Sequence, residues 1–215
     1  MKTTHNKLPK LSKIIGQIEN PILKEICLTA FSDPDFLVSP ASCRKHQPYK
    51  SGLVDHVFEV LEIALQIAEC KELRVNRDVL ITAVIWHDYG KIWDYKLNPN
   101  MADPFPGSCK PKLIDPSDPE YIYTRHRWTV RHVARSYHEF MSVAKKAKLD
   151  ENLAEEIGHA ILAHHGRTDW GSPVEPLTVE AYILHCADYL SARFSGKPHL
   201  FHTPRTNWAK VKLDD

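Results

Sequence analysis

The sequence predicts an all-α protein, and two features of the chain lead to this expectation. Apolar residues recur with the 3.6-residue period of a helix in one segment after another, and the alternating pattern of a strand is nearly absent. Hydrophobic residues make up 43% of the 215 residues, which is ample for the core of one domain. We therefore expect a single bundle of helices joined by loops.

The first half of the chain divides into two helical regions around a loop. Residues 1–35 are expected to form a helical segment that packs on the core, with an apolar pattern over 11–31 and a break near Asn20-Pro21. Residues 32–51 are rich in Ser, Pro and Asp, which predicts a loop. Residues 53–70 follow the helical period closely, and His56 projects from the apolar side of that helix.

The next helix is expected over residues 79–89, with Asp78 as its cap and Gly90 at its end. Residues 94–120 contain six prolines, which exclude a long helix there. Loops of this length are usually functional or mobile, so this proline-rich insert is a candidate lid.

Three further helices are expected in the second half of the chain. They span about 125–148, then 151–165 behind the capping residue Asp150, and finally the region from the capping residue Thr178 to about 194. Residues 195–215 are polar with two prolines and are expected to form an irregular tail.

Composition narrows the classes of function. The net charge is +1, so no global field draws the chain to nucleic acid or to a membrane surface. No stretch approaches the roughly 20 apolar residues that span a bilayer, and the N-terminus lacks the apolar region of a signal peptide. The five cysteines have no metal-binding spacing and are odd in number, which indicates reduced thiols in a cytoplasmic protein.

The pair His87-Asp88 closes the apolar run 79–86, where an unpaired carboxylate would cost several kcal/mol, so it requires a metal ion or a charged partner. Other predicted helices supply suitable partners. The candidate metal ligands are His56, His87, Asp88, His132, His164, His165 and Asp188. Imidazole with carboxylate suits iron, manganese, cobalt, nickel or zinc, with magnesium as a further option. We expect two ions, bridged by Asp88.

Each of these residues also has a simpler interpretation. His87 and Asp88 are compatible with a buried hydrogen-bonded pair, and His56 with an ordinary core histidine. Asp188 is compatible with an ion pair to Arg193, and His132 with a solvated basic helix face. His164 and His165 diverge by about 100° on a helix, so both act as ligands only if they reach different sides of a site. Occupancy by a single ion also stays open.

Lys91 follows Asp88 by three residues and is a candidate for offsetting charge on a phosphate oxygen; a surface lysine is the alternative. Arg131 and Arg167 are further candidates for phosphate contacts. Asp88 and Lys91 are therefore the predicted catalytic residues.

The ordered set His56, His87-Asp88 and Asp188 resembles the signature of HD-domain metal-dependent phosphohydrolases, and residues 87–91 resemble the HD-x-G-K core of that signature. Three longer segments look like the HD domain of YhaM-type 3′–5′ exoribonucleases: residues 40–56, 164–173 and 180–188. The similarity covers roughly 36–194, which implies an HD-domain helical bundle over that range.

The chain departs from the exoribonucleases in one respect that bears on the substrate. Those enzymes carry an OB-fold ahead of the HD domain, whereas the residues before 36 show no strand pattern. The paired histidines also occur in HD-GYP phosphodiesterases, but the GYP signature is missing after His165. A similar HD region occurs in conjugative relaxases.

The resemblance implies an enzyme that cleaves a phosphoester bond in a nucleotide or short oligonucleotide with a metal-activated hydroxide. His56, His87, Asp88 and Asp188 are expected to hold one ion, and Asp88 with His132, His164 and His165 the second. The alternatives are a 3′–5′ exonuclease acting on long nucleic acid, a conjugation-related DNA-processing protein, and a nucleotide-binding sensor without catalysis.

Overall fold

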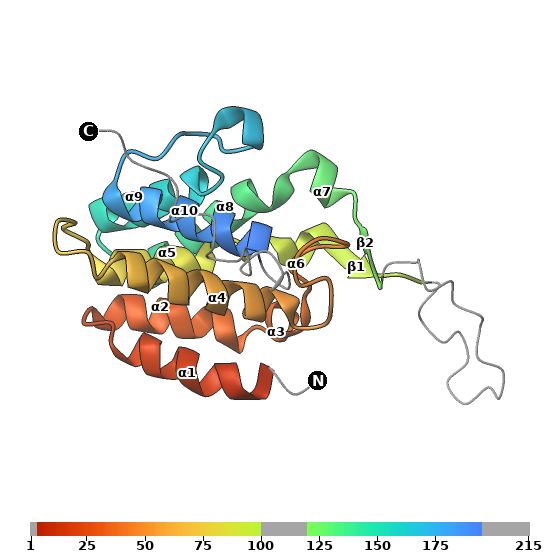
Figure 1. Cartoon of the computed structure of the whole chain (residues 1–215), viewed down its shortest axis with the longest axis horizontal. Helices are drawn as coiled ribbons and strands as arrows, with labels where there is room; N and C mark the ends of the chain where they lie inside the picture. Colours follow the sequence, from red (N-terminus) through yellow and green to blue (C-terminus); the bar gives the residue numbers. More distant parts are fainter. Residues whose placement is uncertain (1–3, 100–119, 195–215) are drawn as a thin grey trace, which may run out of the picture.

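The computed structural model describes residues 4–99 and 120–194, and helices dominate this part of the chain (Figure 1). The all-α expectation is confirmed. The helices are α1 (Thr4–Gly16), α2 (Pro21–Ser32), α3 (Pro34–Val38), α4 (Gly52–Ile67), α5 (Arg77–Trp86), α6 (Lys91–Asp94), α7 (His126–Thr129), α8 (Arg131–Lys146), α9 (Glu151–Ala163) and α10 (Val179–Phe194), with a short 3-10 turn at Thr168–Trp170.

The helices are arranged in layers around α4 and α5. Figure 1 shows α1 and α2 below this pair and α8, α9 and α10 above it. Helix α4 packs against α10, and α5 packs against both α2 and α9. Leu53, Val84, Phe140 and Ile157 are completely buried in one continuous core that also contains Leu11 of α1. The N-terminal helices therefore pack on the same core as the helices that carry the candidate ligands.

Several predicted helix boundaries are confirmed by the capping contacts. The break near Asn20-Pro21 is present, and the Asn20 side chain accepts hydrogen bonds from the amides of Ile22 and Leu23. Asp150 caps α9 through the amide of Leu153, and Thr178 accepts a hydrogen bond from the amide of Ala181 in α10. These side chains satisfy amides that the first turn of a helix leaves unpaired.

The predicted cap at Asp78 is wrong. Helix α5 begins earlier, and the side chain of Asn76 accepts hydrogen bonds from the amides of Asp78 and Val79. Asp78 lies in the first turn, and its carboxylate accepts hydrogen bonds from the amides of Glu19 and Asn20. The carboxylate therefore joins α5 to the start of α2, a tertiary contact that capping rules do not include.

Two other segments are more ordered than the sequence predicted. Residues 34–38 form α3 within the predicted loop 32–51. At the margins of the proline-rich insert, strand β1 (Tyr95–Leu97) pairs antiparallel with β2 (Tyr121–Tyr123). Three-residue strands carry too little alternation to be recognised in a sequence. The greater part of the candidate lid and the tail 195–215 lie outside the described residues.

The predicted helix over 125–148 is divided at Arg131, which has a left-handed φ of 65°. Helix α8 starts there, so His132 lies in its first turn and is only 4% exposed. Gly90 allows α8 to come this close, since a Cβ atom on Gly90 would lie 2.3 Å from the carbonyl oxygen of His132. The chain therefore bends where the second half of the candidate site begins.

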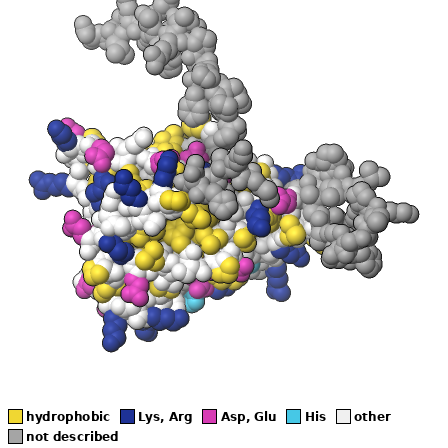
Figure 2. Space-filling view, turned by 90° about the horizontal axis from the view of Figure 1, so that it is seen from below, with side chains coloured by type: hydrophobic (Ala, Val, Ile, Leu, Met, Phe, Trp, Pro, Cys, Tyr) yellow, Lys and Arg dark blue, Asp and Glu magenta, His cyan; other side chains and the backbone are white. Residues whose placement is uncertain are grey.

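Charges of both signs are interspersed on the face of the molecule seen from below in Figure 2, around apolar side chains in the middle. This view agrees with the net charge of +1 and shows no large surface of one sign. In the described part of the chain, every helix is too short or too polar to cross a bilayer.

Candidate metal centre

The structure brings the seven predicted ligands together in two clusters. The first, called the four-ligand group, consists of His56 from α4, His87 and Asp88 after α5, and Asp188 from α10. One potential ligand atom from each of these residues lies within 4.8 Å of the others. Helices α4, α5 and α10 pack against one another, so residues 132 positions apart in the sequence meet in the same cluster.

Distances within the four-ligand group fit a shared cation. His56 Nε2 lies 3.2 Å from Asp88 Oδ2 and 3.0 Å from Asp188 Oδ1. His87 Nε2 lies 3.3 Å from Asp88 Oδ2. Ligand atoms bonded to one ion lie roughly 3.0–3.4 Å apart when each bond is near 2.1 Å. The cluster therefore has the spacing of a metal site.

The second cluster, called the three-histidine group, consists of His132 at the start of α8 and of His164 and His165 after α9. Its ligand atoms also lie within 4.8 Å of one another. His132 Nε2 and His164 Nε2 lie 3.5 and 3.8 Å from Asp88 Oδ1. One oxygen of Asp88 thus faces each group, which is the arrangement that a bridging carboxylate requires.

Four of the five histidines are oriented through their other ring nitrogen. His87 Nδ1 and His164 Nδ1 each lie 2.7 Å from a backbone carbonyl oxygen three residues earlier, so each must donate a hydrogen bond there. His56 Nδ1 contacts Ser191 Oγ at 3.0 Å, and His132 Nδ1 contacts Asp94 Oδ2 at 3.2 Å. A histidine held in this way directs the lone pair of Nε2 toward a metal.

The donor atoms that face the centre fit a divalent ion. In the described part of the chain, Nε2 of His56, His87 and His164 is buried and makes no hydrogen bond. A buried polar atom without a partner is costly, and a cation would satisfy all three lone pairs. Imidazole nitrogens with two carboxylates match the preferences of borderline first-row divalent ions.

The protonation states also suit a metal site. Burial raises the pKa of Asp88, but the neighbouring Lys91 and His87 outweigh it and hold this pKa well below its usual range. Burial, with the neighbouring His165 and His87, lowers the pKa of His164 far below its usual value. Burial and His132 lower the pKa of His165 to about 4. Ionised carboxylates and neutral imidazoles are the forms that bind metals.

The pKa of His56 shifts in the opposite direction to those of His164 and His165. Burial lowers its pKa, but the carboxylates of Asp188 and Asp88 outweigh that effect and raise it. The same contact, mainly with His56, overcomes the effect of burial on Asp188 and lowers the pKa of this carboxyl group. Asp188 forms no ion pair with Arg193 among the described residues, so the alternative of a simple surface pair has no support in the geometry.

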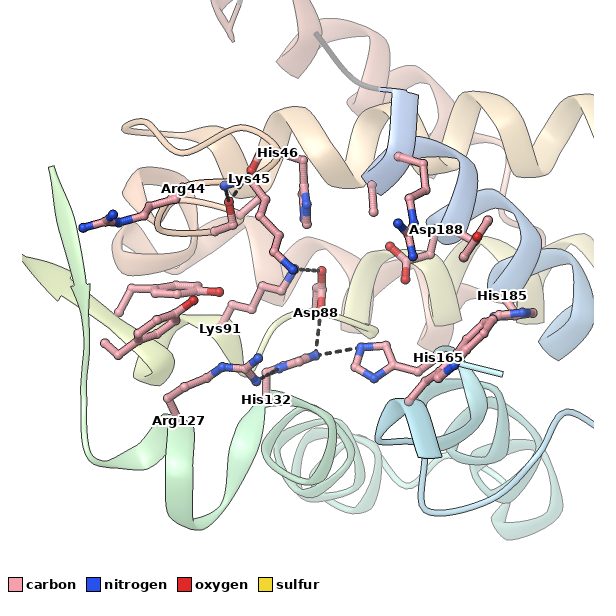
Figure 3. A pocket seen from close by; sticks show the side chains of 18 residues that line it. Arg44, Lys45, His46, Asp88, Lys91, Arg127, His132, His165, His185 and Asp188 are labelled. Atoms are coloured by element: carbon pink, nitrogen blue, oxygen red, sulfur yellow. Dashed lines mark hydrogen bonds and ion pairs between the residues drawn. The ribbon is translucent and has the colours of Figure 1, made fainter. Parts of the chain in front are cut away.

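The pocket above the two groups has a volume of about 700 Å³. Asp88, Lys91, His132, His165 and Asp188 line it, and His56, His87 and His164 are completely buried beneath. The ammonium of Lys91 lies 2.5 Å from Asp88 Oδ2 and only 7% of the residue is exposed, so the surface-lysine alternative is wrong. In Figure 3, Lys91 points toward Asp88 from the side of the pocket where Arg44, Lys45 and Arg127 also lie.

The two arginines predicted to contact phosphate do not line this pocket. Arg131 is exposed at the start of α8, and Arg167 forms an ion pair with Asp169 at 2.9 Å on the surface. Arg127, which is one helical turn before Arg131, lines the pocket instead and lies 3.6 Å from Asp94. Arg131 itself has the left-handed φ of 65°, so it does not continue the helix that carries Arg127.

Sequence reasoning missed Asp94, which was assigned to the proline-rich insert. Asp94 ends α6, is completely buried and contacts His126 Nδ1 at 2.9 Å as well as His132. Its position three residues after Lys91 places both on one face of a single helical turn, which is a signal that the sequence contains. His46 was also given no role, although its ring lies 4.8 Å from that of His56 and lines the pocket.

Gly166 allows the paired histidines to end α9 at the pocket. Its φ is +83°, and a Cβ atom there would lie 2.2 Å from the ring of His185. His185 Nδ1 lies 2.9 Å from the carbonyl oxygen of His164, so His185 supports the turn, and it belongs to neither ligand group. Any larger residue at position 166 would displace His185 and, through it, His164.

Comparison with known proteins identifies relatives of the chain. It is 31% identical to the 3′-5′ exoribonuclease YhaM of Listeria innocua over 187 residues, which is 85% of this chain and 52% of the relative. The identity to the YhaM proteins of Bacillus subtilis and Shouchella clausii is 29% and 28%, over 86% and 89% of this chain. The chain thus spans about half the length of the curated relatives it matches. No solved structure matches it.

The HD-domain family matches residues 53–193, a range that contains both ligand groups. The match agrees with the resemblance that the histidine and aspartate motifs indicated. The chain therefore belongs to the HD-domain family.

Proposed function

We propose that this chain hydrolyses a phosphoester bond in a nucleotide or a short oligonucleotide, using two divalent ions. The observation that carries the proposal is Asp88, whose two oxygens face two separate sets of imidazoles at the floor of the pocket. Ions held by such a pair of sites lower the pKa of a water and offset the charge of a phosphate group.

Separate residues are proposed to bind the metal ions and to contact the phosphate. The four-ligand group and the three-histidine group would hold the ions, and Nδ1 contacts keep four of their five imidazoles oriented before substrate arrives. Lys91 is proposed to hold a non-bridging phosphate oxygen, where its positive charge stabilises the charge that develops in the transition state. Its burial beside Asp88 keeps the ammonium ordered.

The pocket supports a small substrate. Its volume of about 700 Å³ lies within the range of roughly 300–1,000 Å³ that is typical of small-molecule sites. Arg44, Lys45 and Arg127 at its rim match a phosphate-bearing ligand, whereas the net charge of +1 offers little attraction for a long polyanion.

A second candidate function is 3′–5′ exonuclease activity on long RNA. The similarity to the YhaM exoribonucleases favours it, and the cationic rim would also accept the end of a chain. The two candidates differ in the dependence of the reaction on substrate length.

The deciding experiment compares kcat/KM for a dinucleotide, a decamer and a long single strand of RNA and of DNA at one salt concentration. Metal content is measured on protein purified without added nickel. We expect two equivalents of metal and the highest kcat/KM for the dinucleotide. A clear preference for long RNA would support the exonuclease, and a preference for DNA the DNA-processing alternative. Binding of nucleotides without hydrolysis, with every metal of the candidate set, would favour a sensor.

A further inference from the structure

We propose that Trp170 and Tyr189 form a stacking platform for one terminal base of the substrate, so that the pocket recognises a nucleotide chain by its base as well as its phosphate. This inference rests on the proposed hydrolysis of nucleotides and specifies how the substrate lies. The argument starts from the two aromatic side chains and their position beside the ligand groups.

Each of the two rings follows a candidate metal ligand closely. Tyr189 comes directly after Asp188 on α10, and Trp170 ends the 3-10 turn that follows His164-His165. The rings are stacked, with centroids 5.8 Å apart and planes only 15° from parallel. Both line the pocket, and Trp170 is 48% and Tyr189 40% exposed. Two large aromatic side chains therefore present surface beside the metal ligands.

Neighbouring side chains hold this platform in place. The ring of His185 lies 6.1 Å from that of Trp170 and 6.3 Å from that of Tyr189, and the carbonyl oxygen of His164 anchors His185. The guanidinium of Arg193 lies 5.1 Å from the centre of the Tyr189 ring, and that of Arg167 lies 5.5 Å from the Trp170 ring. Rings ordered before binding lose little entropy when a base stacks on them.

The other side of the pocket has a different chemistry. Figure 3 shows Arg44, Lys45, Lys91 and Arg127 on one side of Asp88, and His185, which contacts the platform, on the opposite side near His165. Asp88 lies between the cationic and the aromatic sides. This arrangement matches a substrate whose scissile phosphate lies over Asp88, with one base on the platform and the rest of the chain toward Arg44 and Arg127.

The second aromatic pair in the pocket fits a base less well. Tyr95 and Tyr123 are tilted by 36°, and the guanidinium of Arg127 lies 5.9 Å from the centre of the Tyr123 ring. Arg127 in turn faces Asp94, so the pair of Tyr95 and Tyr123 belongs to the cationic side.

Base stacking on aromatic side chains tolerates every base, so the platform of Trp170 and Tyr189 predicts recognition of a base without selection of its identity.

The test uses an adenine dinucleotide and two analogues, one abasic at the 5′ position and the other abasic at the 3′ position. For the wild-type protein, we expect one of the two analogues to lose roughly 5- to 150-fold in kcat/KM relative to the parent, the range that one base–aromatic stack supplies. In Trp170→Leu and Tyr189→Leu, the ratio of kcat/KM for the parent dinucleotide to kcat/KM for that analogue should fall close to one. Circular dichroism verifies that both variants are folded.

Tyr182→Leu is the matched control, because Tyr182 lies two turns earlier on α10, is 56% exposed and does not line the pocket. It should keep the wild-type ratio. Equal cleavage of all three substrates by the wild-type protein would overturn the platform and leave the proposed hydrolysis intact. A Tyr182→Leu variant that loses the ratio as Tyr189→Leu does would also overturn it.

If the wild-type protein hydrolyses none of these substrates, the affinity for the same dinucleotide, measured by calorimetry, tests the platform independently of hydrolysis. Weaker binding by Tyr189→Leu than by Tyr182→Leu would support the platform although the proposed hydrolysis had failed. Equal binding by the two variants, or no binding by the wild-type protein, would refute the platform.

Discussion

The two ligand groups share Asp88 but differ in charge and in how firmly their side chains are held. The four-ligand group combines two imidazoles with two carboxylates, whereas the three-histidine group adds only imidazoles to its share of Asp88. His56 and His87 are completely buried, and the Nδ1 atom of each is held by a hydrogen bond. His165 is partly exposed, and its Nδ1 makes no hydrogen bond within the described part of the chain.

This comparison indicates that the two sites bind metal with different strength. Two carboxylate charges neutralise a divalent cation, and preoriented imidazoles need not be reordered when it binds. In the three-histidine group, His132 and His165 contact each other through their Nε2 atoms at 3.2 Å. One Nε2 must carry the proton of this hydrogen bond, so that ring must change its tautomer before both can bind an ion. We therefore expect the four-ligand group to bind more tightly, and the following predictions test this difference.

The largest effect is expected for Asp88→Ala. This change removes the carboxylate that faces both groups, so both ions should be lost and hydrolysis should fall to background. Elemental analysis and an assay on the dinucleotide measure the two effects, and circular dichroism verifies the helical fold. A variant with the metal content and turnover of the wild-type protein would contradict the bridging role.

His165→Ala should separate the two groups. Removing the least restrained ligand should lower the metal content from two equivalents to one, whereas the four-ligand group keeps its ion. His56→Ala is the matched change in the other group and should impair the tighter site. Titration of each variant with manganese or zinc, followed by calorimetry, measures the affinities. If the two variants lose the same ion, the division into two groups is wrong.

Lys91→Ala should lower turnover by roughly 100-fold without lowering metal content, because the ammonium is a source of positive charge and not a ligand. Lys50→Ala, which changes an exposed lysine outside the pocket, is the control and should retain wild-type kinetics. Single-turnover rates on the dinucleotide provide the comparison. Unchanged rates in Lys91→Ala would leave this lysine with only its ion pair to Asp88.

Asp94→Asn should weaken metal binding at the three-histidine group by roughly 10- to 100-fold, since the carboxylate orients His132. Glu59→Gln is the corresponding change for the four-ligand group, because Ser191 contacts His56 and donates a hydrogen bond to Glu59 at 3.1 Å. Calorimetric titration should show that each variant weakens a different site. An identical effect of both changes on the two sites would contradict these separate roles.

The smallest effect is expected for Asn76→Ala. This change removes the cap of α5 far from the pocket rim and should lower the free energy of unfolding by about 1 kcal/mol. Urea denaturation of the apo protein measures the change. Metal affinity should stay at the wild-type value in both groups, and a large loss at either one would show that the cap is coupled to the site.

Much of the fold could be predicted because the helix signals are local. The apolar period and the caps at Asn20, Asp150 and Thr178 depend on neighbours within a few residues, and each carries its information in the sequence. The helix start at Asn76 was missed because two capping residues, Asn76 and Asp78, lie two positions apart and compete, and the contact of Asp78 with the start of α2 decides between them.

The residue types of the candidate site were equally visible in the sequence, since histidines and aspartates on apolar segments require partners. What the sequence by itself determined was therefore the helical fold class and a candidate set of ligands. Only the tertiary structure decided that Asp88 faces both groups, that Asp94 supports His132, and that Arg127 rather than Arg131 reaches the pocket. These relations depend on how helices pack across long sequence separations, and the local period of a sequence does not encode such distances.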